Sequence, residues 1–453
     1  MSARSELASP AVANGRYETE RVELTVDSVA PGGHCVARLD GQVVFVRHAL
    51  PGERVVAEIT EVHRGYLRAD AVTVLTAAPE RVTPPCPYAG PDRCGGCDLQ
   101  HVSPDGQRAW KASVVREQLR RLGGFSEAEL DDLGVRVEAL PGGMLGWRSR
   151  VRYAVDAAGR AGLLKHRSHE VVPIDRCLIA HPAIQELPVL ASNGRRWPDA
   201  DAVETVASSG GDVVVRGISA GTGGFGDLFE AGDFGEVAGA GGGGPRGAGA
   251  GDAGPVDAGP VDAGAPTVRE LAAGREWKIP AEAFWQVHPA AADTLVAAVL
   301  DLLDPVAGES AWDLYGGAGL FAGALAGRVG PTGRVTLVEA APPGVAAARE
   351  NLRDLPQVEV VSARVETALA RRRVTGPVDL VVLDPPRTGA GGPVTRAVAD
   401  SGARAVAYVA CDPAAFARDV RTFRDAGWRL VALRGYDLFP MTQHVELVGL
   451  LVP

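Results

Sequence analysis

The hydrophobic pattern divides the chain into stretches with different rhythms. Between residues 18 and 77, short β-branched runs such as RVELTVDSV and QVVFVRHAL are separated by Gly and Pro turns at 31–33, 40–41 and 51–52. Several short strands at this spacing predict a small OB-like barrel. Barrels of this kind often bind single-stranded nucleic acid, although these residues fit a purely structural β-module equally well.

The middle of the chain is strand-rich and then loses its apolar residues. From about 133 to 235 strand patterns dominate, with a hairpin predicted around Ala158 and Gly159. The stretch 238–266 repeats Ala-Gly-Pro-Val-Asp and has almost no apolar bulk. We expect a disordered insertion there, because such a segment cannot bury enough apolar surface to offset its ordering entropy. Residues 1–17 are expected to form a disordered leader.

From Ser310 onward, strand-like runs alternate with helical ones, as in RVTLVEA followed by PPGVAAARENLRDL. This alternation predicts βαβ units, that is, a mostly parallel sheet with helices on both faces. The sequence thus predicts four parts. They are the leader 1–17, a barrel over 18–77, a central domain over 78–280 that contains the insertion, and an α/β domain over 281–453.

The turns that follow the strands of the α/β domain predict a cofactor site. Asp313 lies on the first strand, and the glycine-rich turn 316–319 lets the backbone approach a ligand at the carboxyl edge of the sheet. Glu339 ends the next strand, where a carboxylate can bind both hydroxyls of a ribose. Asp384 opens DPPR, whose prolines stiffen a floor for a planar base. In this order the residues predict an S-adenosylmethionine site, because a dinucleotide site would need G-x-G-x-x-G.

A lone cysteine marks the end of another strand. The buried-strand pattern of 405–409 ends at Cys411, which is followed by Asp-Pro. A thiolate at this edge could add to C6 of a uracil, so that C5 can take a methyl group from a sulfonium. A base must then remove the C5 proton, and Glu446, entering the last strand, fits that role. The alternative is that Cys411 is a small buried hydrophobic residue.

Several motifs together resemble a known family: VACDPAAFARD, DPPRTG, DLFPMTQHVE, FWQVH and, in the barrel, GGHCVARLDGQVVFVRHALPGERV. The chain resembles the RNA uracil-5 methyltransferases, in particular the subgroup with an N-terminal TRAM barrel and an iron–sulfur cluster. The resemblance covers nearly the whole chain except the leader and the insertion. It implies a Rossmann-like class I methyltransferase domain, an OB-like TRAM barrel and a central strand-rich domain that carries a four-cysteine cluster site.

The resemblance also implies roles for individual residues. Cys411 would be the nucleophile and Glu446 the proton acceptor. The cofactor would be contacted by Gln286, Tyr315, Gly317, Glu339 and Asp384. The chain departs from the family at two positions, with His288 where Asn is usual and Gly316 where Cys is usual. The first exchanges an amide for an imidazole near the site, and the second suits the turn.

The cysteines suggest a metal site. Three of the six lie in CPYAGPDRCGGC, and a fourth ligand is expected in VPIDRCLIAHP, which gives the set Cys86, Cys94, Cys97 and Cys177. Four thiolates suit either a [4Fe–4S] cluster or a tetrahedral zinc ion, and the spacing does not separate them. The resemblance favours the [4Fe–4S] cluster.

The net charge of −10 does not exclude a nucleic-acid partner, because the first 180 residues are balanced and the acidic excess lies after them. The resemblance implies structured RNA as the partner, with 23S rRNA favoured over transfer RNA. Arg148, Arg150 and Arg152 could meet phosphate, or could form a solvated strand face. Two other interpretations are a non-catalytic RNA-binding protein, which His288 would favour, and a DNA or small-molecule methyltransferase, which the barrel disfavours.

The chain has no apolar run long enough to cross a membrane, and its first twenty residues lack the apolar segment of a secretory signal. We therefore expect a cytoplasmic protein with no membrane partner. The sequence does not indicate an oligomeric state.

Overall fold

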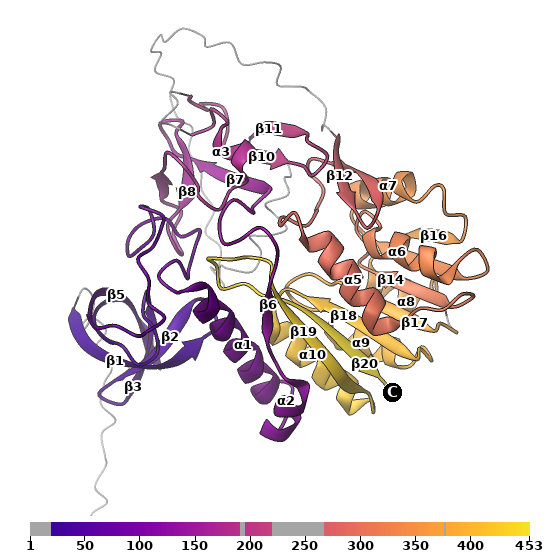
Figure 1. Cartoon of the computed structure of the whole chain (residues 1–453), viewed down its shortest axis with the longest axis horizontal. Helices are drawn as coiled ribbons and strands as arrows, with labels where there is room; N and C mark the ends of the chain where they lie inside the picture. Colours follow the sequence, from indigo (N-terminus) through magenta and orange to yellow (C-terminus); the bar gives the residue numbers. More distant parts are fainter. Residues whose placement is uncertain (1–19, 191–194, 220–266, 376) are drawn as a thin grey trace, which may run out of the picture.

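The computed structural model describes residues 20–190, 195–219, 267–375 and 377–453. The predicted leader 1–17 and the predicted insertion 238–266 lie outside these ranges. Figure 1 shows an indigo barrel, a magenta central sheet and an orange-to-yellow α/β unit. Among the described helices, none combines the length and the apolar character that a bilayer span requires.

The N-terminal strands close into the barrel that the sequence predicts. The strand order is β1-β2-β3-β5-β4. Inward side chains such as Val44, Val46 and Leu67 are fully buried and alternate with more exposed neighbours, as expected for strands with one wet face. The strands are β1 (Arg21–Ala30), β2 (His34–Leu39), β3 (Gln42–Arg47), β4 (Arg54–Val62) and β5 (Tyr66–Thr76).

The central sheet has five strands in the order β11-β10-β7-β8-β9. The predicted hairpin is present, because β7 and β8 pair antiparallel around a tight turn at 156–160. A separate two-stranded ribbon, β12 with β13, leads into the α/β unit. The elements are β7 (Arg150–Val155), β8 (Ala161–Leu164), β9 (Val171–Pro173), α3 (Pro182–Gln185), β10 (Ala202–Ala207), β11 (Val213–Ile218), β12 (Thr267–Ala272) and β13 (Arg275–Pro280).

The α/β unit contains an eight-stranded sheet in the order β16-β15-β14-β17-β18-β20-β19-β6. The strands from β16 to β18 run parallel, and β20 is antiparallel to both of its neighbours. The strands are β14 (Ser310–Leu314), β15 (Arg334–Glu339), β16 (Val358–Ser362), β17 (Leu380–Leu383), β18 (Ala405–Ala410), β19 (Arg429–Asp437), β20 (Glu446–Val452) and the short β6 (Val137–Ala139).

Helices cover both faces of this sheet, as the alternating pattern predicts. One apolar core joins α5 and α6 to the sheet, and a second joins α1, α9 and α10 to the opposite face. The helices are α1 (Pro104–Arg121), α2 (Glu127–Leu133), α5 (Ala291–Leu303), α6 (Leu320–Val329), α7 (Pro342–Asn351), α8 (Val365–Ala370), α9 (Gly391–Ala399) and α10 (Pro413–Asp425). The segment 104–139, within the predicted central domain 78–280, therefore packs on the large sheet through α1 and extends it with β6 (Figure 1).

The suggestion that Arg150 meets phosphate is wrong. Its side chain is 1% exposed and forms an ion pair with Glu270 of β12, with 3.4 Å between Nη2 and Oε1. Its Nη1 donates to the carbonyls of Ala281 and Ala283. Arg150 therefore joins the central sheet to the ribbon and to the start of the α/β unit.

Replacing this buried cation should destabilise the protein. We expect Arg150→Met to lower the free energy of unfolding by about 3–5 kcal/mol, because Glu270 would remain buried without its partner. Urea denaturation followed by tryptophan fluorescence measures this. The control is Arg160→Met, which removes an exposed pair with Asp156 and should cost no more than about 1 kcal/mol. Equal effects of the two substitutions would contradict the structural role of Arg150.

Candidate active site

The glycine-rich turn after β14 forms a tight cradle at the carboxyl edge of the sheet. Tyr315 and Gly317 both have left-handed backbone conformations, with φ of 67° and 51°. A Cβ on Gly316 would lie 2.5 Å from Cγ of Leu337, so this packing requires the glycine that replaces the family's usual cysteine. The N–H of Gly317 donates to Oε2 of Glu339 at 2.9 Å, which places the predicted ribose-binding carboxylate directly against the turn.

Three carboxylates converge beside this cradle. Burial raises the pKa of Asp313 to about 7, with the Glu339 charge adding to the effect. Burial also raises the pKa of Asp384, at the end of β17, to about 7, and both Asp313 and Glu339 contribute. Asp313 Oδ1 is buried and has no hydrogen-bond partner among the described residues. These three carboxylates therefore fit a ligand that carries positive charge, as S-adenosylmethionine does through its sulfonium and ammonium groups.

The local sequence explains why a buried strand ends in Cys411. All six residues of β18 are buried, as is typical of a strand in the interior of a parallel sheet. Asp412 then caps α10 by accepting the N–H of Ala415 at 2.7 Å, and Pro413 occupies the first helical turn. The strand-to-helix turn thus fixes Cys411 at the carboxyl edge of the sheet.

Strand pairing brings Glu446 beside Cys411. Strands β18 and β20 pair antiparallel with Ala410 opposite Leu447, so the next residues across the ladder are Cys411 and Glu446. Burial raises the pKa of the Cys411 thiol, and Glu446 raises it further. Burial also raises the pKa of Glu446, which is 4% exposed, and the neighbouring Asp384 adds to that shift.

One cation faces this acidic cluster and was not singled out from the sequence. Arg387, in the DPPR turn, lowers the pKa of both Cys411 and Glu446 and so opposes the effect of burial. Its Nη2 lies 3.4 Å from Nε2 of His444. Burial keeps His444 neutral by lowering its pKa, and the Arg387 charge contributes. Arg387 lies in the motif DPPRTG and His444 in the motif DLFPMTQHVE, and these two motifs are the feature of the sequence that could have identified both residues.

The rate of thiol chemistry here should rise with pH. Because the pKa of Cys411 lies above its usual value, only a small fraction is thiolate near pH 7, and that fraction grows by up to about tenfold per pH unit. Ionisation of Asp384, with its pKa of about 7, opposes the loss of the thiol proton and flattens the rise. Single-turnover methylation between pH 6 and 9 checks this. Arg387→Leu should move the rising limb to higher pH, and a rate that falls with pH would contradict the assignment.

The two remaining predicted positions lie in the loop between β13 and α5. Gln286 is partly exposed there. His288 is 3% exposed, and its Nδ1 accepts the N–H of Ala290 at 3.1 Å. Its ring stacks on Trp147 with an interplanar angle of 17°, and burial lowers its pKa to about 4. His288 is therefore a neutral stacking residue at the position where the family usually carries Asn.

A groove of about 490 Å³ runs from the barrel past the central sheet to the catalytic edge. His34 of β2 lines its barrel end, and Arg387 and His444 line the end near Cys411. The wall between them carries Arg148 and Arg152, together with Lys165, His166, Arg167 and His169 from the turn between β8 and β9. The basic side chains give this groove the electrostatic character of a nucleic-acid track.

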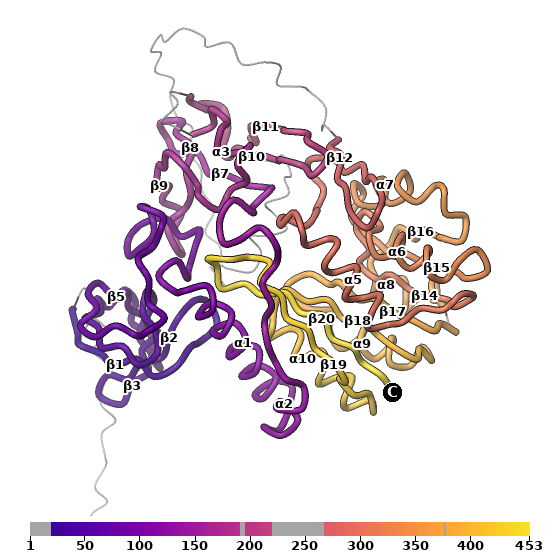
Figure 2. The backbone as a smooth tube through the Cα atoms, in the orientation of Figure 1, coloured from indigo at the N-terminus to yellow at the C-terminus, as the bar shows by residue number. Residues whose placement is uncertain are grey.

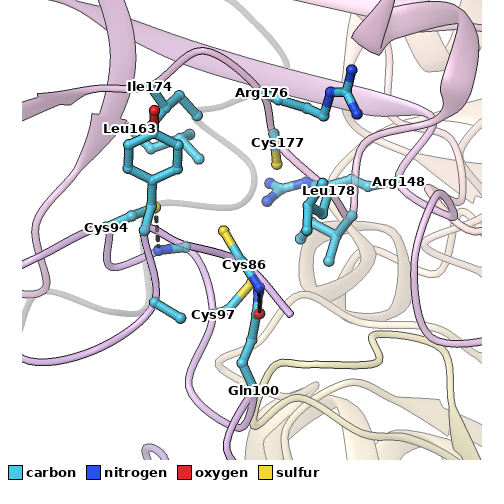
Figure 3. Close-up of a pocket in the computed structure, with 14 residues that line it drawn as sticks. Cys86, Cys94, Cys97, Gln100, Arg148, Leu163, Ile174, Arg176, Cys177 and Leu178 are labelled. Carbon is cyan, nitrogen blue, oxygen red and sulfur yellow. Dashed lines mark hydrogen bonds between the residues drawn. The ribbon is translucent and has the colours of Figure 1, made fainter. Parts of the chain in front are cut away.

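The four predicted metal ligands line one pocket (Figure 3). Their thiols are free, and Arg148 also lines this pocket. Burial raises the pKa of the Cys94 thiol to about 11, and burial raises those of Cys97 and Cys177 as well. Among the described residues, however, no three His, Cys, Asp or Glu side chains are grouped so that they could hold a metal ion. The metal site therefore stays a prediction.

The chain is similar in sequence to several known proteins. The TRAM domain family matches residues 15–72. An uncharacterised RNA methyltransferase from Streptomyces avermitilis is 46% identical and covers 96% of this chain and 98% of its own length. The 23S rRNA (uracil(1939)-C(5))-methyltransferase RlmD of Chromohalobacter salexigens is 32% identical, covering 98% and 94%.

The fold is shared with a solved structure. The Pyrococcus abyssi tRNA (uracil-54, C5)-methyltransferase, in complex with S-adenosyl-L-homocysteine, superposes with a TM-score of 0.65 at 22% identity over 95% of this chain and all of that one. The fold and the sequence relatives together define a class I, S-adenosylmethionine-dependent RNA methyltransferase with an N-terminal TRAM barrel. The chain belongs to the RNA uracil-C5 methyltransferase family.

Proposed function

We propose that this protein methylates C5 of a uridine in structured RNA through a covalent adduct between Cys411 and C6 of the base, and that 23S rRNA is its substrate. The observation that carries the proposal is the pairing of β18 with β20, which sets Cys411 beside Glu446 at the edge that holds the cofactor carboxylates. The RlmD relative supports 23S rRNA, since it is similar along nearly its whole length.

The residues divide the reaction between them. Cys411, once its proton has passed to solvent, forms a bond from Sγ to C6, and the electron pair of the C5=C6 bond moves toward the C4 carbonyl as an enolate. C5 then takes the methyl group that S-adenosylmethionine supplies. Glu446 accepts the proton from C5, the double bond re-forms, and the thiolate leaves. Arg387 favours the thiolate, because it lowers the pKa of Cys411.

Gln286, Tyr315, Gly317, Glu339 and Asp384 are proposed to bind the cofactor. Glu339 supports this role through its contact with the glycine turn, where a ribose hydroxyl could share its carboxylate. The charge of Asp384 raises the pKa of both Cys411 and Glu446, and the charges of Asp313 and Glu339 raise the pKa of Asp384. Asp384 is thus suited to contact either the cofactor or the edge of the uracil.

We also propose that Cys86, Cys94, Cys97 and Cys177 hold a [4Fe–4S] cluster. Four cysteines around one pocket supply the donor set of such a cluster. Zinc is the weaker alternative, because structural zinc sites usually use two CxxC pairs and this set of four cysteines contains one, Cys94 with Cys97. The cluster would hold loops together, and no catalytic step passes through it. Iron and sulfide analysis of anaerobically purified protein tests the assignment, and one zinc per chain would overturn it.

The groove is the proposed path of the RNA, with the target uridine flipped toward Cys411. We expect Arg148→Ala with Arg152→Ala to weaken RNA binding and to reduce the slope of log K against log salt by about 1.4, since each single-strand phosphate contact contributes about 0.7. Filter binding at several salt concentrations measures this. Arg328→Ala with Arg349→Ala, two exposed arginines on α6 and α7, is the matched control. Equal slopes for the two double variants would contradict the path.

The proposed reaction is tested with RNA that carries 5-fluorouridine. Fluorine cannot leave C5 as a proton does, so the methylated adduct should persist as a denaturation-resistant protein–RNA band. We expect this band with 23S rRNA fragments in the presence of S-adenosylmethionine. A band with transfer RNA alone would move the substrate to transfer RNA, the substrate of the Pyrococcus enzyme. No band with either RNA would favour a non-catalytic RNA-binding protein.

Since ribosomal RNA lies in the cytoplasm, we also propose that this protein is located in the cytoplasm.

A further inference from the structure

The catalytic edge depends on a loop that reaches far from its own sheet. Residues 438–445 connect β19 to β20, and Figure 2 shows this yellow loop leaving the large sheet for the purple part of the chain. The loop carries His444 and leads directly into Glu446. Its position therefore decides where His444 lies against Arg387 and how the chain enters β20 at Glu446, whose place opposite Cys411 is set by the strand pairing.

The loop is strained and is held from outside. Met441 has φ of 69°, an unfavourable conformation for a residue with a side chain. Its carbonyl accepts the N–H groups of Asp98 and Leu99 at 3.0 and 2.9 Å. Its own N–H donates to Oε1 of Gln107, a fully buried residue of α1. The strained conformation thus persists because three hydrogen bonds, two from the segment at 98–99 and one to α1, hold it.

Asp98 makes further contacts of a different kind. Its Oδ2 accepts the N–H of Gln443 at 3.1 Å, and its Oδ1 lies 3.5 Å from Nη2 of Arg47 in the barrel. A Cβ on Gly33 would lie 2.6 Å from Cβ of Asp98, so the barrel turn also packs against it. The side chain of Asp98 therefore contacts both the loop 438–445 and the barrel.

The segment that carries Asp98 also supports the basic wall of the groove. Three residues before it, the N–H of Gly95 donates to the carbonyl of Leu164 at 2.9 Å. A Cβ on Gly95 would lie 2.4 Å from the backbone nitrogen of His166, so the turn between β8 and β9 packs directly on this segment. The segment 94–99 contains Cys94 and Cys97, two of the four cysteines that line the proposed metal pocket. It lies between the basic wall of the groove and the loop 438–445.

We propose that Asp98 is a positioning residue for the methyl transfer: it fixes the loop 438–445 relative to the barrel and the basic groove, so that RNA held in the groove meets a correctly placed Glu446. This inference rests on the proposed function and deepens it, because it assigns to one side chain the alignment of the bound RNA with the catalytic residues.

The test is Asp98→Ala in the full-length protein with its metal site intact. We expect kcat to fall by about 10- to 100-fold, the usual cost of a small misplacement of catalytic groups, while S-adenosylhomocysteine affinity and the melting temperature change little. Hydrogen exchange should become faster at the amides of Met441 and Gln443. Asp98→Asn, whose side-chain oxygen can still accept the Gln443 N–H, should restore most of kcat.

The matched control is Asp105→Ala, the same change of charge at an exposed position seven residues along the chain. It should leave kcat and loop exchange as in the wild type. Unchanged kcat in Asp98→Ala, or a loss that also removes S-adenosylhomocysteine binding, would overturn the positioning role. An inactive wild type would instead refute the proposed function, and the exchange of the loop amides would still decide the role of Asp98.

Discussion

Cys411→Ala is expected to reduce methylation by at least about 10⁴-fold and to abolish the 5-fluorouridine adduct. The reason is that C5 of uracil becomes a competent nucleophile only after a thiolate has added to C6, and Cys411 is the thiol that the end of β18 places beside Glu446. Binding of S-adenosylhomocysteine should persist, because the cofactor cradle is built on β14 and β15. Single-turnover transfer of labelled methyl groups and a denaturing gel measure the two effects.

Cys35→Ala is the control for this substitution. Cys35 is also an isolated cysteine, but it is buried in the barrel and its Sγ contacts the carbonyl of Ala49 at 3.3 Å. Assayed below its melting temperature, this variant should retain both activity and adduct. Residual methylation above about 1% in Cys411→Ala would rule out the covalent mechanism.

Glu446→Gln is expected to stop the reaction one step later. A glutamine cannot accept the C5 proton, so the methylated base should remain attached to Cys411 even on ordinary uridine. We expect kcat to fall by about 10²- to 10⁴-fold, and a protein–RNA band that needs S-adenosylmethionine to accumulate. The variant differs from the wild type in one atom of a buried side chain, so the cofactor cradle should be unaffected.

Two controls separate this outcome from a general defect. Glu359→Gln, an exposed change on β16, should turn over normally without accumulating a band. Adding Cys411→Ala to Glu446→Gln should remove the band altogether. Turnover within tenfold of the wild type by Glu446→Gln would assign the proton transfer to another group, and Asp384, whose charge raises the pKa of Glu446, would be the candidate.

Local patterns predicted those parts of the structure that depend on neighbouring residues. Short β-branched runs between Gly and Pro turns identified the barrel strands, and the apolar run 405–409 identified β18, which in the structure continues to Ala410. The Asp-Pro that follows Cys411 ends the strand, and in the structure Asp412 also caps α10, a role that had not been assigned from the sequence. The same local signals misled at Arg150, because an alternating strand does not reveal which of its faces a distant ribbon will cover.

The sequence by itself thus determined the elements of this protein, the chemistry available at the strand ends and the residues that can carry it. Hydrophobic periodicity and turn residues act over a few neighbouring positions, so the elements that they specify can be predicted from the sequence. Only the tertiary structure decided which of these groups meet. The register of β18 against β20 joins Cys411 to Glu446, and the contacts of Asp98 join the barrel to the loop at 438–445. Such contacts link residues tens to hundreds of positions apart, and their free energy depends on the packing of the whole fold.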